Sequence, residues 1–405
     1  MRRALTAVIV LMGASAPAWT QTEPLALVNV HVFDGVSQTI AEDRVLLVRD
    51  GTIEVIGEAD TRIPSDYTII DGEGFYVMPG LFDVHTHVNR LDQAKRALES
   101  GVTTIRTASV PAFQDVAMRE LVRSGQVAGP DVVAAGVFVT PDLGQTVLAD
   151  PRLAELHDGV TSDEALRLLV NINADRGVDV IKTRGTQRAG LPDTDPRQQV
   201  YTERQLRIVV DEAAKHDIPV MVHAHGDEGA RAAVLAGARS IEHGTYLSDE
   251  TLALMAERGT WLVPTFVTMD ELNEEQYDYV LRLRGKHMLP HLERAIRQAH
   301  RMGVPIATGA DNYYDNKSIN RISIEVEHFV RLGMSNFEAL QTATVNSAAL
   351  LRMEDSTGRI AEGFEADLIL VPGNPLDDVA VLQDVLLVMS NGRVAVKRIP
   401  FGVSD

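Results

Sequence analysis

The central part of the chain alternates short apolar runs with longer amphipathic stretches. Residues 178–185, 218–226 and 304–310 read VDVIKTRG, IPVMVHAHG and VPIATGA. Runs that are apolar nearly throughout are typical of parallel strands buried on both faces. Between such runs lie stretches with helical periodicity, for example residues 161–177 and 202–217. Strands that alternate with helices in this way predict βα units and a parallel sheet.

Eight candidate strands can be counted in this region. They are residues 81–88, 103–109, 132–139, 178–185, 218–226, 240–244, 260–267 and 304–310. Eight parallel strands are the number that closes a barrel, and residues 79–351 have about the usual length of one. The predicted fold class is therefore α/β, with residues 79–351 forming a (β/α)8 TIM-type barrel.

The two ends of the chain have a different pattern. Residues 25–80 and 358–396 return to β character, and Asp-Gly pairs such as Asp50 and Gly51 suit tight hairpin turns. We expect the segments 23–78 and 352–405 to pair as one small composite β-sandwich beside the barrel.

The first 18 residues resemble a signal peptide. Arg2 and Arg3 precede an apolar stretch at residues 4–13, and Ala16-Pro17-Ala18 has the form of a cleavage site. The expectation is a secreted or periplasmic protein after cleavage of residues 1–18. The alternative is a buried N-terminal strand or helix. The apolar stretch is too short for a stable membrane span.

Composition narrows the classes of partner. The chain has 405 residues, a formal charge of -19 and no cysteine. An acidic chain offers no basic field to attract phosphates, which argues against a nucleic-acid partner. The absence of cysteine excludes disulfides.

Residues with metal-ligand chemistry stand at or near the ends of the predicted strands. They are His85, His87, Lys182, His223, His243 and Asp311. Alternate residues of a strand face the same side, so His85 and His87 can hold one cation together. An isolated pair of this kind is more often a turn or two hydrogen-bonded core histidines. The later residues end strands that one barrel rim would collect, and together the six predict a metal site.

Lys182 is the unusual member of this set. A protonated lysine cannot bind a metal, but burial lowers the pKa of an amine, and a neutral amine can capture carbon dioxide. The resulting carbamate is a carboxylate able to bridge two divalent ions. The alternative is a structural ion pair between Lys182 and Asp179 or Asp311.

Several motifs together resemble the amidohydrolase superfamily. They are PGLFDVHTHV, VIKTRG, VMVHAHG, SIEHG, ATGAD and TVNSAALLRMEDSTGRIAEGFEADLILV. The resemblance is to the binuclear metal-dependent group that includes prolidase-like Xaa-Pro dipeptidases or carboxypeptidases and imidazolonepropionase-related proteins. It implies a (β/α)8 barrel flanked by a β-sandwich, in agreement with the pattern above.

The resemblance also implies a ligand set. The more buried metal falls to His85, His87 and Asp311, and the second to His223 and His243, with carboxylated Lys182 bridging both. The first histidine of the HAHG stretch is the ligand in the family, which leaves His225 to contact substrate or to serve as a hydrogen-bond partner. Histidine and carboxylate ligands fit zinc, and also manganese, cobalt or nickel. Two zinc ions are the expectation.

In this family a hydroxide that bridges the metals is the nucleophile, since coordination lowers the pKa of water. Asp311 would move the proton to the leaving nitrogen, or else act only as a ligand while water or His225 supplies the proton. Arg184 is a candidate for a substrate carboxylate, although a structural ion pair is the commoner role. Tyr246 and Tyr313, which follow strand ends, are candidate substrate contacts. For them and for Tyr314 the ordinary alternative is an aromatic side chain packed in a loop.

One departure from the family pattern concerns the loop after the third strand. Prolidase-like enzymes commonly carry a histidine there that polarises the scissile carbonyl, whereas this chain reads GVFVTPDLGQTV. His157 is the nearest candidate along the chain. The substrate assignment therefore depends on fewer residues than the metal site does.

The function predicted from the sequence is metal-dependent hydrolysis of an amide or peptide bond in a small substrate. A dipeptide or an N-acyl amino acid is the leading substrate class. The alternatives are a cyclic-amide, lactone or ester hydrolase on the same site and a non-catalytic metal-binding protein. Barrels of this family often associate, so a homo-oligomer is also expected.

Overall fold

The computed structural model describes residues 23–315 and 321–399 of the chain. The predicted signal peptide, residues 1–18, lies outside the described residues. Among the helices of the described part, none is long and apolar enough to cross a membrane.

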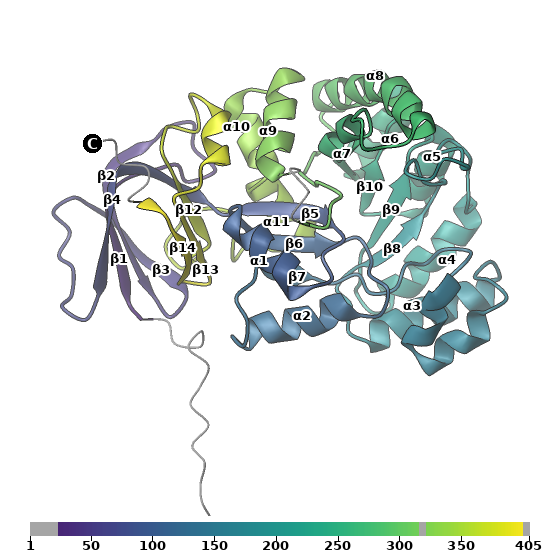
Figure 1. Cartoon of the computed structure of the whole chain (residues 1–405), viewed down its shortest axis with the longest axis horizontal. Coiled ribbons are helices and arrows are strands. Elements are labelled where there is room, and N and C mark those ends of the chain that lie inside the picture. The colour runs from purple at the N-terminus through teal and green to yellow at the C-terminus, as the bar shows by residue number, and fades with distance from the viewer. Residues whose placement is uncertain (1–22, 316–320, 400–405) are drawn as a thin grey trace, which may run out of the picture.

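The two ends of the described chain form one seven-stranded mixed sheet, here called the terminal sheet (Figure 1). Its strands are β1 (Leu25–Val32), β2 (Ala41–Arg49), β3 (Thr52–Glu58), β4 (Thr68–Pro79), β12 (Leu368–Val371), β13 (Leu387–Ser390) and β14 (Arg393–Lys397). The strand order is β14-β13-β12-β4-β1-β2-β3. The antiparallel pair β4–β12, with Leu368 opposite Pro79, joins the two ends as the sequence predicted. Apolar residues from both ends share one core, including Leu27, Ile70 and Leu368.

The central region contains two parallel sheets. The first, in the order β5-β6-β7, has strands β5 (Leu81–Thr86), β6 (Val102–Thr107) and β7 (Asp131–Val133). The second, in the order β11-β10-β9-β8, has strands β8 (Ile181–Arg184), β9 (Val220–Ala224), β10 (Ser240–His243) and β11 (Trp261–Val263). Nearly every residue of these strands is buried, which explains their continuous apolar runs. The α/β class is therefore confirmed.

Isolated parallel bridges link strands or segments that do not share a ladder. Val139 bridges Thr183, Leu262 bridges Ile306, and Thr86 bridges Asn312. The segment 304–310, predicted as the eighth strand, contributes one isolated bridge, at Ile306, and no ladder. Pro305 has no N–H to donate, and Asp311 turns out of the extended region at φ 48°. The third predicted strand is also shorter, because Gly136 at φ 63° ends its extended course.

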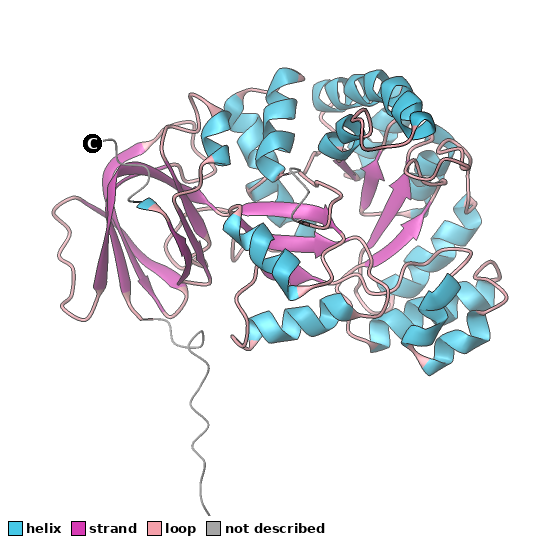
Figure 2. Ribbon diagram, viewed as in Figure 1, coloured by secondary structure: helices cyan, strands magenta, loops and turns pink. Residues whose placement is uncertain are grey.

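Helices surround the central sheets and lie between successive strands (Figure 2). They are α1 (Leu91–Glu99), α2 (Gln114–Arg123), α3 (Asp163–Asp175), α4 (Glu203–Ala214), α5 (Asp227–Ala236), α6 (Asp249–Arg258), α7 (Phe266–Glu271), α8 (Tyr279–Arg301), α9 (Ile322–Arg331), α10 (Asn336–Thr342) and α11 (Val345–Leu351), with 3-10 turns η1 (Gly144–Ala149), η2 (Pro151–Leu156) and η3 (Val379–Gln383). Local signals set several starts: Ser162 caps α3, and Thr202 with Gln205 forms a capping box on α4. The strand–helix alternation places each strand's carboxyl end at the same side of the sheets.

Two neighbouring residues of β4 test the terminal sheet. Ile70 is 6% exposed and Ile69 is 57% exposed, because successive residues of a strand face opposite sides. We expect Ile70→Ala to lower the free energy of unfolding by about 2–5 kcal/mol through the lost contacts and the cavity left behind. Ile69→Ala, the matched control, should change it by less than about 1 kcal/mol. Denaturant titration measures both, and equal losses would contradict the burial pattern.

Candidate metal centre and active site

One cavity of about 980 Å³ collects the strand-end residues that the sequence singled out. Its lining includes all six predicted ligands, namely His85, His87, Lys182, His223, His243 and Asp311, together with His225, Arg184 and Tyr313. β5, β8, β9 and β10 supply most of them, so the carboxyl ends of the parallel strands build the site.

The first group of potential ligands is His85, His87 and Asp311, whose ligand atoms lie within 4.8 Å of one another. Asp311 Oδ1 is 3.1 Å from His87 Nε2 and 3.5 Å from His85 Nε2. The backbone holds this arrangement, because the Asp311 N–H donates to the His85 carbonyl at 2.7 Å. A carboxylate and two imidazoles at this spacing fit a divalent cation.

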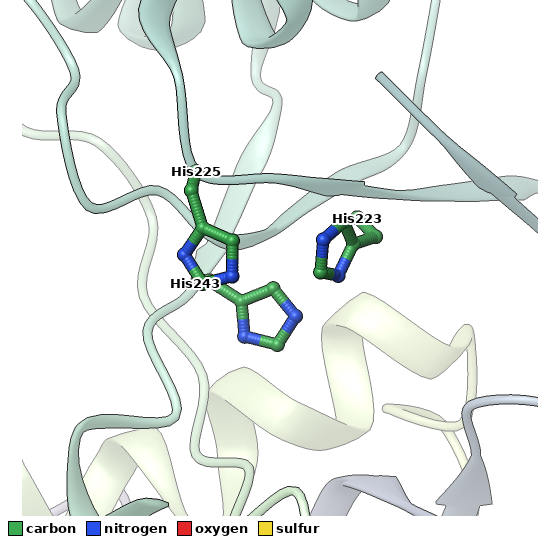
Figure 3. A group of neighbouring side chains, drawn as sticks. All are labelled: His223, His225 and His243. Atoms are coloured by element: carbon green, nitrogen blue, oxygen red, sulfur yellow. The ribbon is translucent and has the colours of Figure 1, made fainter. Parts of the chain in front are cut away.

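The second group is His223, His225 and His243, which converge in Figure 3. Their ligand nitrogens also lie within 4.8 Å of one another. The His225 and His243 rings stack with centroids 4.5 Å apart, while His223 meets His243 edge-on at 4.6 Å. The structure thus adds His225 to the donor set that the sequence had limited to His223 and His243.

Each of the five imidazoles has one ring nitrogen engaged by a partner. His85 Nδ1–H donates to Glu242 at 2.6 Å, and the N–H groups of His87 and His223 donate to the carbonyls of Ser109 and Gln187 at 3.1 Å each. The remaining two contacts join His225 Nδ1 to Thr245 Oγ1 at 2.9 Å and His243 Nδ1 to Thr265 Oγ1 at 2.7 Å. Such partners fix ring orientation and tautomer, which leaves the second nitrogen of each ring available to a metal.

Burial keeps four of these imidazoles in the neutral state that metals require, namely those of His85, His223, His225 and His243. It lowers the pKa of His85 to about 4 and that of His225 to about 3. It also lowers the pKa values of His223 and His243 well below the ordinary value. Neutral imidazoles at physiological pH are ready to ligate.

Asp311 is ionised in this setting. Burial alone would raise its pKa, but the facing imidazoles of His85 and His87 outweigh burial and lower it to about 2. A negative carboxylate therefore faces the ring nitrogens of His85 and His87.

A buried ion pair supports the first group from behind. Arg106 Nη2 lies 2.9 Å from Glu242 Oε1, with the two side chains 2% and 0% exposed. Burial raises the pKa of Glu242, but Arg106 and His85 together lower it to about 2. Glu242 therefore remains a carboxylate that orients His85. Neither Arg106 nor Glu242 was predicted from the sequence, although charged residues within buried strands are a signal for such a pair.

Lys182 lies beside the first group and is 2% exposed. Its Nζ is 3.5 Å from His85 Nε2, and burial lowers its pKa to about 8. Asp179, one predicted ion-pair partner, binds Arg119 instead. Among the described residues, no carboxylate lies within salt-bridge distance of Lys182, so the structural ion pair considered for it does not form.

Asp83 anchors the loop that carries Asp311. Its carboxylate accepts hydrogen bonds from the Ala310 N–H at 3.0 Å and the Tyr314 hydroxyl at 2.7 Å. Tyr314 is 5% exposed and is a packed aromatic, as its ordinary alternative predicted. Tyr313 instead stacks on His87 with ring centroids 5.3 Å apart and lines the cavity.

Two other candidates lie away from this cavity. Tyr246 contacts His287 and His291 of α8 and is absent from the described residues that line the cavity. His157 is exposed and bonds the carbonyl of Ala154. The Tyr246 ring therefore packs against α8 and does not line the cavity in this arrangement.

Comparisons with known proteins agree with this site. The family model described as "Amidohydrolase family" matches residues 76–395. An ochratoxinase of Aspergillus niger is 28% identical over 84% of this chain and 79% of its own length. An imidazolonepropionase of Kosmotoga olearia is 25% identical, covering 88% of this chain and 91% of its own. The crystal structure of a Xaa-Pro dipeptidase with methionine in its active site is 27% identical, with a TM-score of 0.81 over 92% of this chain and 99% of that one.

The matching solved structures and the family together imply a TIM-barrel α/β fold. The family is generally metal-dependent, and both histidine groups fit that property. The matched residues contain every predicted ligand, and the prolidase-like and imidazolonepropionase resemblance is confirmed. The chain belongs to the amidohydrolase family and is an enzyme that hydrolyses carbon–nitrogen bonds.

Proposed function

We propose that this amidohydrolase binds two zinc ions and cleaves the amide bond of a dipeptide or N-acyl amino acid. The observation that carries the proposal is the pair of three-residue ligand groups in one cavity, with the buried Lys182 amine beside the first. The names of the relatives, an ochratoxinase and a Xaa-Pro dipeptidase, support an amide-type substrate.

In this proposal His85, His87 and Asp311 hold one cation, and His223 and His243 hold the other. His225 is then either a further ligand or a contact to the substrate carbonyl, since its free nitrogen belongs to the same group. Lys182 would carry a carbamate formed from carbon dioxide, which would supply a further carboxylate ligand at this centre. Bound cations of this kind lower the pKa of water to about 7 and polarise a carbonyl.

Asp311 is the proposed proton carrier. Its carboxylate is ionised, faces the cavity and can accept a proton from the attacking water. Returning that proton to the leaving nitrogen makes the amine a good leaving group. Arg184, which lines the same cavity, is placed to bind a substrate carboxylate.

We also propose the larger arrangement expected from the sequence. The two parallel sheets and the segment 304–310 form a (β/α)8 barrel over residues 79–351, with single bridges where ladders are short. The expected composite β-sandwich of the two chain ends is supported by the single terminal sheet, whose strands come from residues 25–79 and 368–397. Export to the periplasm or medium rests on the pattern of residues 1–18.

A second candidate function is hydrolysis of a cyclic amide on the same site. Similarity to an imidazolonepropionase is the observation that favours it. A panel of dipeptides, N-acyl amino acids and cyclic amides separates the two candidates by kcat/KM. Metal binding without turnover on any of them would instead favour a non-catalytic protein.

Replacing the proposed proton carrier gives the first test of catalysis. We expect Asp311→Asn to lower kcat by about 10²-fold or more, because an amide cannot accept the proton. Asp158→Asn, at a side chain that is 91% exposed, is the matched control and should retain activity. Steady-state kinetics on the best substrate measure both. Full activity in the Asp311 variant would remove this residue from the mechanism.

The carbamate has a direct spectroscopic test. Protein exchanged into ¹³C-bicarbonate with zinc should give a carbamate resonance that Lys182→Ala lacks. Lys95→Ala, at a side chain 67% exposed, should keep the resonance. Lys182→Ala should also lose one bound metal per chain. A wild-type spectrum without a carbamate signal would contradict the role given to Lys182.

The contact between Glu242 and His85 predicts an effect on metal affinity. Glu242→Gln keeps the size of the side chain but removes the charge that orients the imidazole. We expect about 10- to 100-fold weaker zinc binding in a chelator competition. Glu250→Gln on α6 is the control and should bind zinc as the unchanged protein does. Equal affinities in the two variants would argue against an orienting role for Glu242.

A further inference from the structure

Two arginines, one at the end of β8 and one in the loop that follows, line the active-site cavity without a carboxylate partner. Arg184 ends β8, Arg188 follows it by four residues, and both line the cavity. Among the described residues, neither guanidinium makes a salt bridge, and the buried Arg184 Nε has no hydrogen-bond partner. A buried donor without a partner is costly and is explained when a ligand supplies the acceptor.

Both guanidiniums lie near one aromatic ring, that of Phe138. Arg184 Cζ lies 4.7 Å from the centroid of Phe138, and Arg188 Cζ lies 5.8 Å from it. Lys182 Nζ lies 5.9 Å from the same centroid, so the arginines stand next to the proposed metal centre. Cation–π contacts orient charged groups without neutralising them.

The charges around the cavity leave these arginines uncompensated. The lining contains two arginines, Arg184 and Arg188, and two carboxylates, Asp142 and Asp311, besides Lys182, which carries a carbamate in the proposed function. Asp311 faces the histidines of the first group, and Asp142 accepts the Gly144 N–H. In a chain of formal charge -19, two arginines that line the cavity without a carboxylate partner favour an anionic substrate over a neutral one.

The two arginines also differ in depth. Arg184 is partly buried and two residues from Lys182, whereas Arg188 is exposed. In an N-acyl amino acid the α-carboxylate is one carbon away from the scissile nitrogen, and a side-chain carboxylate lies farther out. An acidic amino acid therefore presents its two charges in the order in which the arginines occur.

We propose that Arg184 and Arg188 form a dicarboxylate site that selects substrates whose amine half is glutamate or aspartate. Arg184 binds the α-carboxylate and Arg188 binds the side-chain carboxylate. The inference rests on the proposed amide hydrolysis. Water adds its oxygen to the acyl carbon, the C–N bond breaks, and a proton goes to nitrogen, releasing the carboxylic acid and the free acidic amino acid.

Isosteric dipeptides test the selection with the zinc-loaded full chain. We expect kcat/KM for Ala-Glu to exceed that for Ala-Gln by about 10- to 100-fold, because only glutamate offers Arg188 a charged acceptor. Arg188→Gln should bring this ratio close to one. Arg197→Gln is the matched control, since Arg197 lies on the same loop, pairs with Asp195 and is 64% exposed.

Calorimetry gives a readout that needs no turnover. Glutarate should bind the zinc-loaded protein more tightly than glutaramate, which has one carboxylate replaced by an amide, and Arg188→Gln should remove the difference. Inorganic phosphate is the competing probe. Displacement of glutarate by phosphate at equal concentration would identify a general anion site and overturn the dicarboxylate assignment.

The outcomes separate this inference from the proposed function. Equal cleavage of Ala-Glu and Ala-Gln would overturn the dicarboxylate site and leave amide hydrolysis standing. Failure to cleave any dipeptide or N-acyl amino acid would overturn the proposed function, while glutarate binding would still decide whether the arginine pair recognises two carboxylates. An unchanged Glu-to-Gln ratio in Arg188→Gln would exclude Arg188 from the selection.

Discussion

The site depends on how its imidazoles are held. Five histidines share one cavity, and each has one ring nitrogen engaged by a carboxylate, a backbone carbonyl or a threonine hydroxyl. Without these contacts the rings could rotate, and buried N–H groups would lose their partners. With them, the second nitrogen of every ring is left for a cation, and two ligand groups arise in a space that the strand ends define.

Electrostatics reinforce the same arrangement. Burial keeps His85, His223, His225 and His243 neutral, while the facing imidazoles of His85 and His87 keep Asp311 ionised. The Arg106–Glu242 pair places a fixed charge behind His85 and is itself fully buried. Removing one partner of such a pair leaves an uncompensated charge in the interior, so the ion pair, His85 and the first ligand group form one unit.

Much of the site could be predicted from the sequence because its ligands stand within or just beyond apolar strands. Position along a parallel strand determines which end of the sheet a residue occupies. The sequence therefore predicts that His85, Lys182, His223 and His243 lie in one site. The contacts that orient them could not, since Glu242, Thr265 and Gln187 meet the histidines only through tertiary structure. The role of Phe138 was missed for the same reason: a single aromatic in an apolar run carries no sign of the arginines it faces.

The fold was predictable to a similar degree. Helices with clear periodicity and caps, such as α3 and α4, appeared where expected, as did the pairing of the two chain ends. Strand lengths were less predictable, because Gly136 and Pro305 interrupt runs that are otherwise apolar. Periodicity identifies a buried segment, but hydrogen-bond registers between distant segments decide whether it forms a ladder.

The central claim is that this cavity holds two cations joined by a modified Lys182. Anomalous diffraction from crystals of the zinc-loaded protein, with data collected on both sides of the zinc absorption edge, tests it most directly. The account predicts two zinc peaks, one at His85, His87 and Asp311 and one at His223 and His243, with density for a carbamate on Lys182 between them. A single peak, or an unmodified lysine with zinc present at full occupancy, would contradict it.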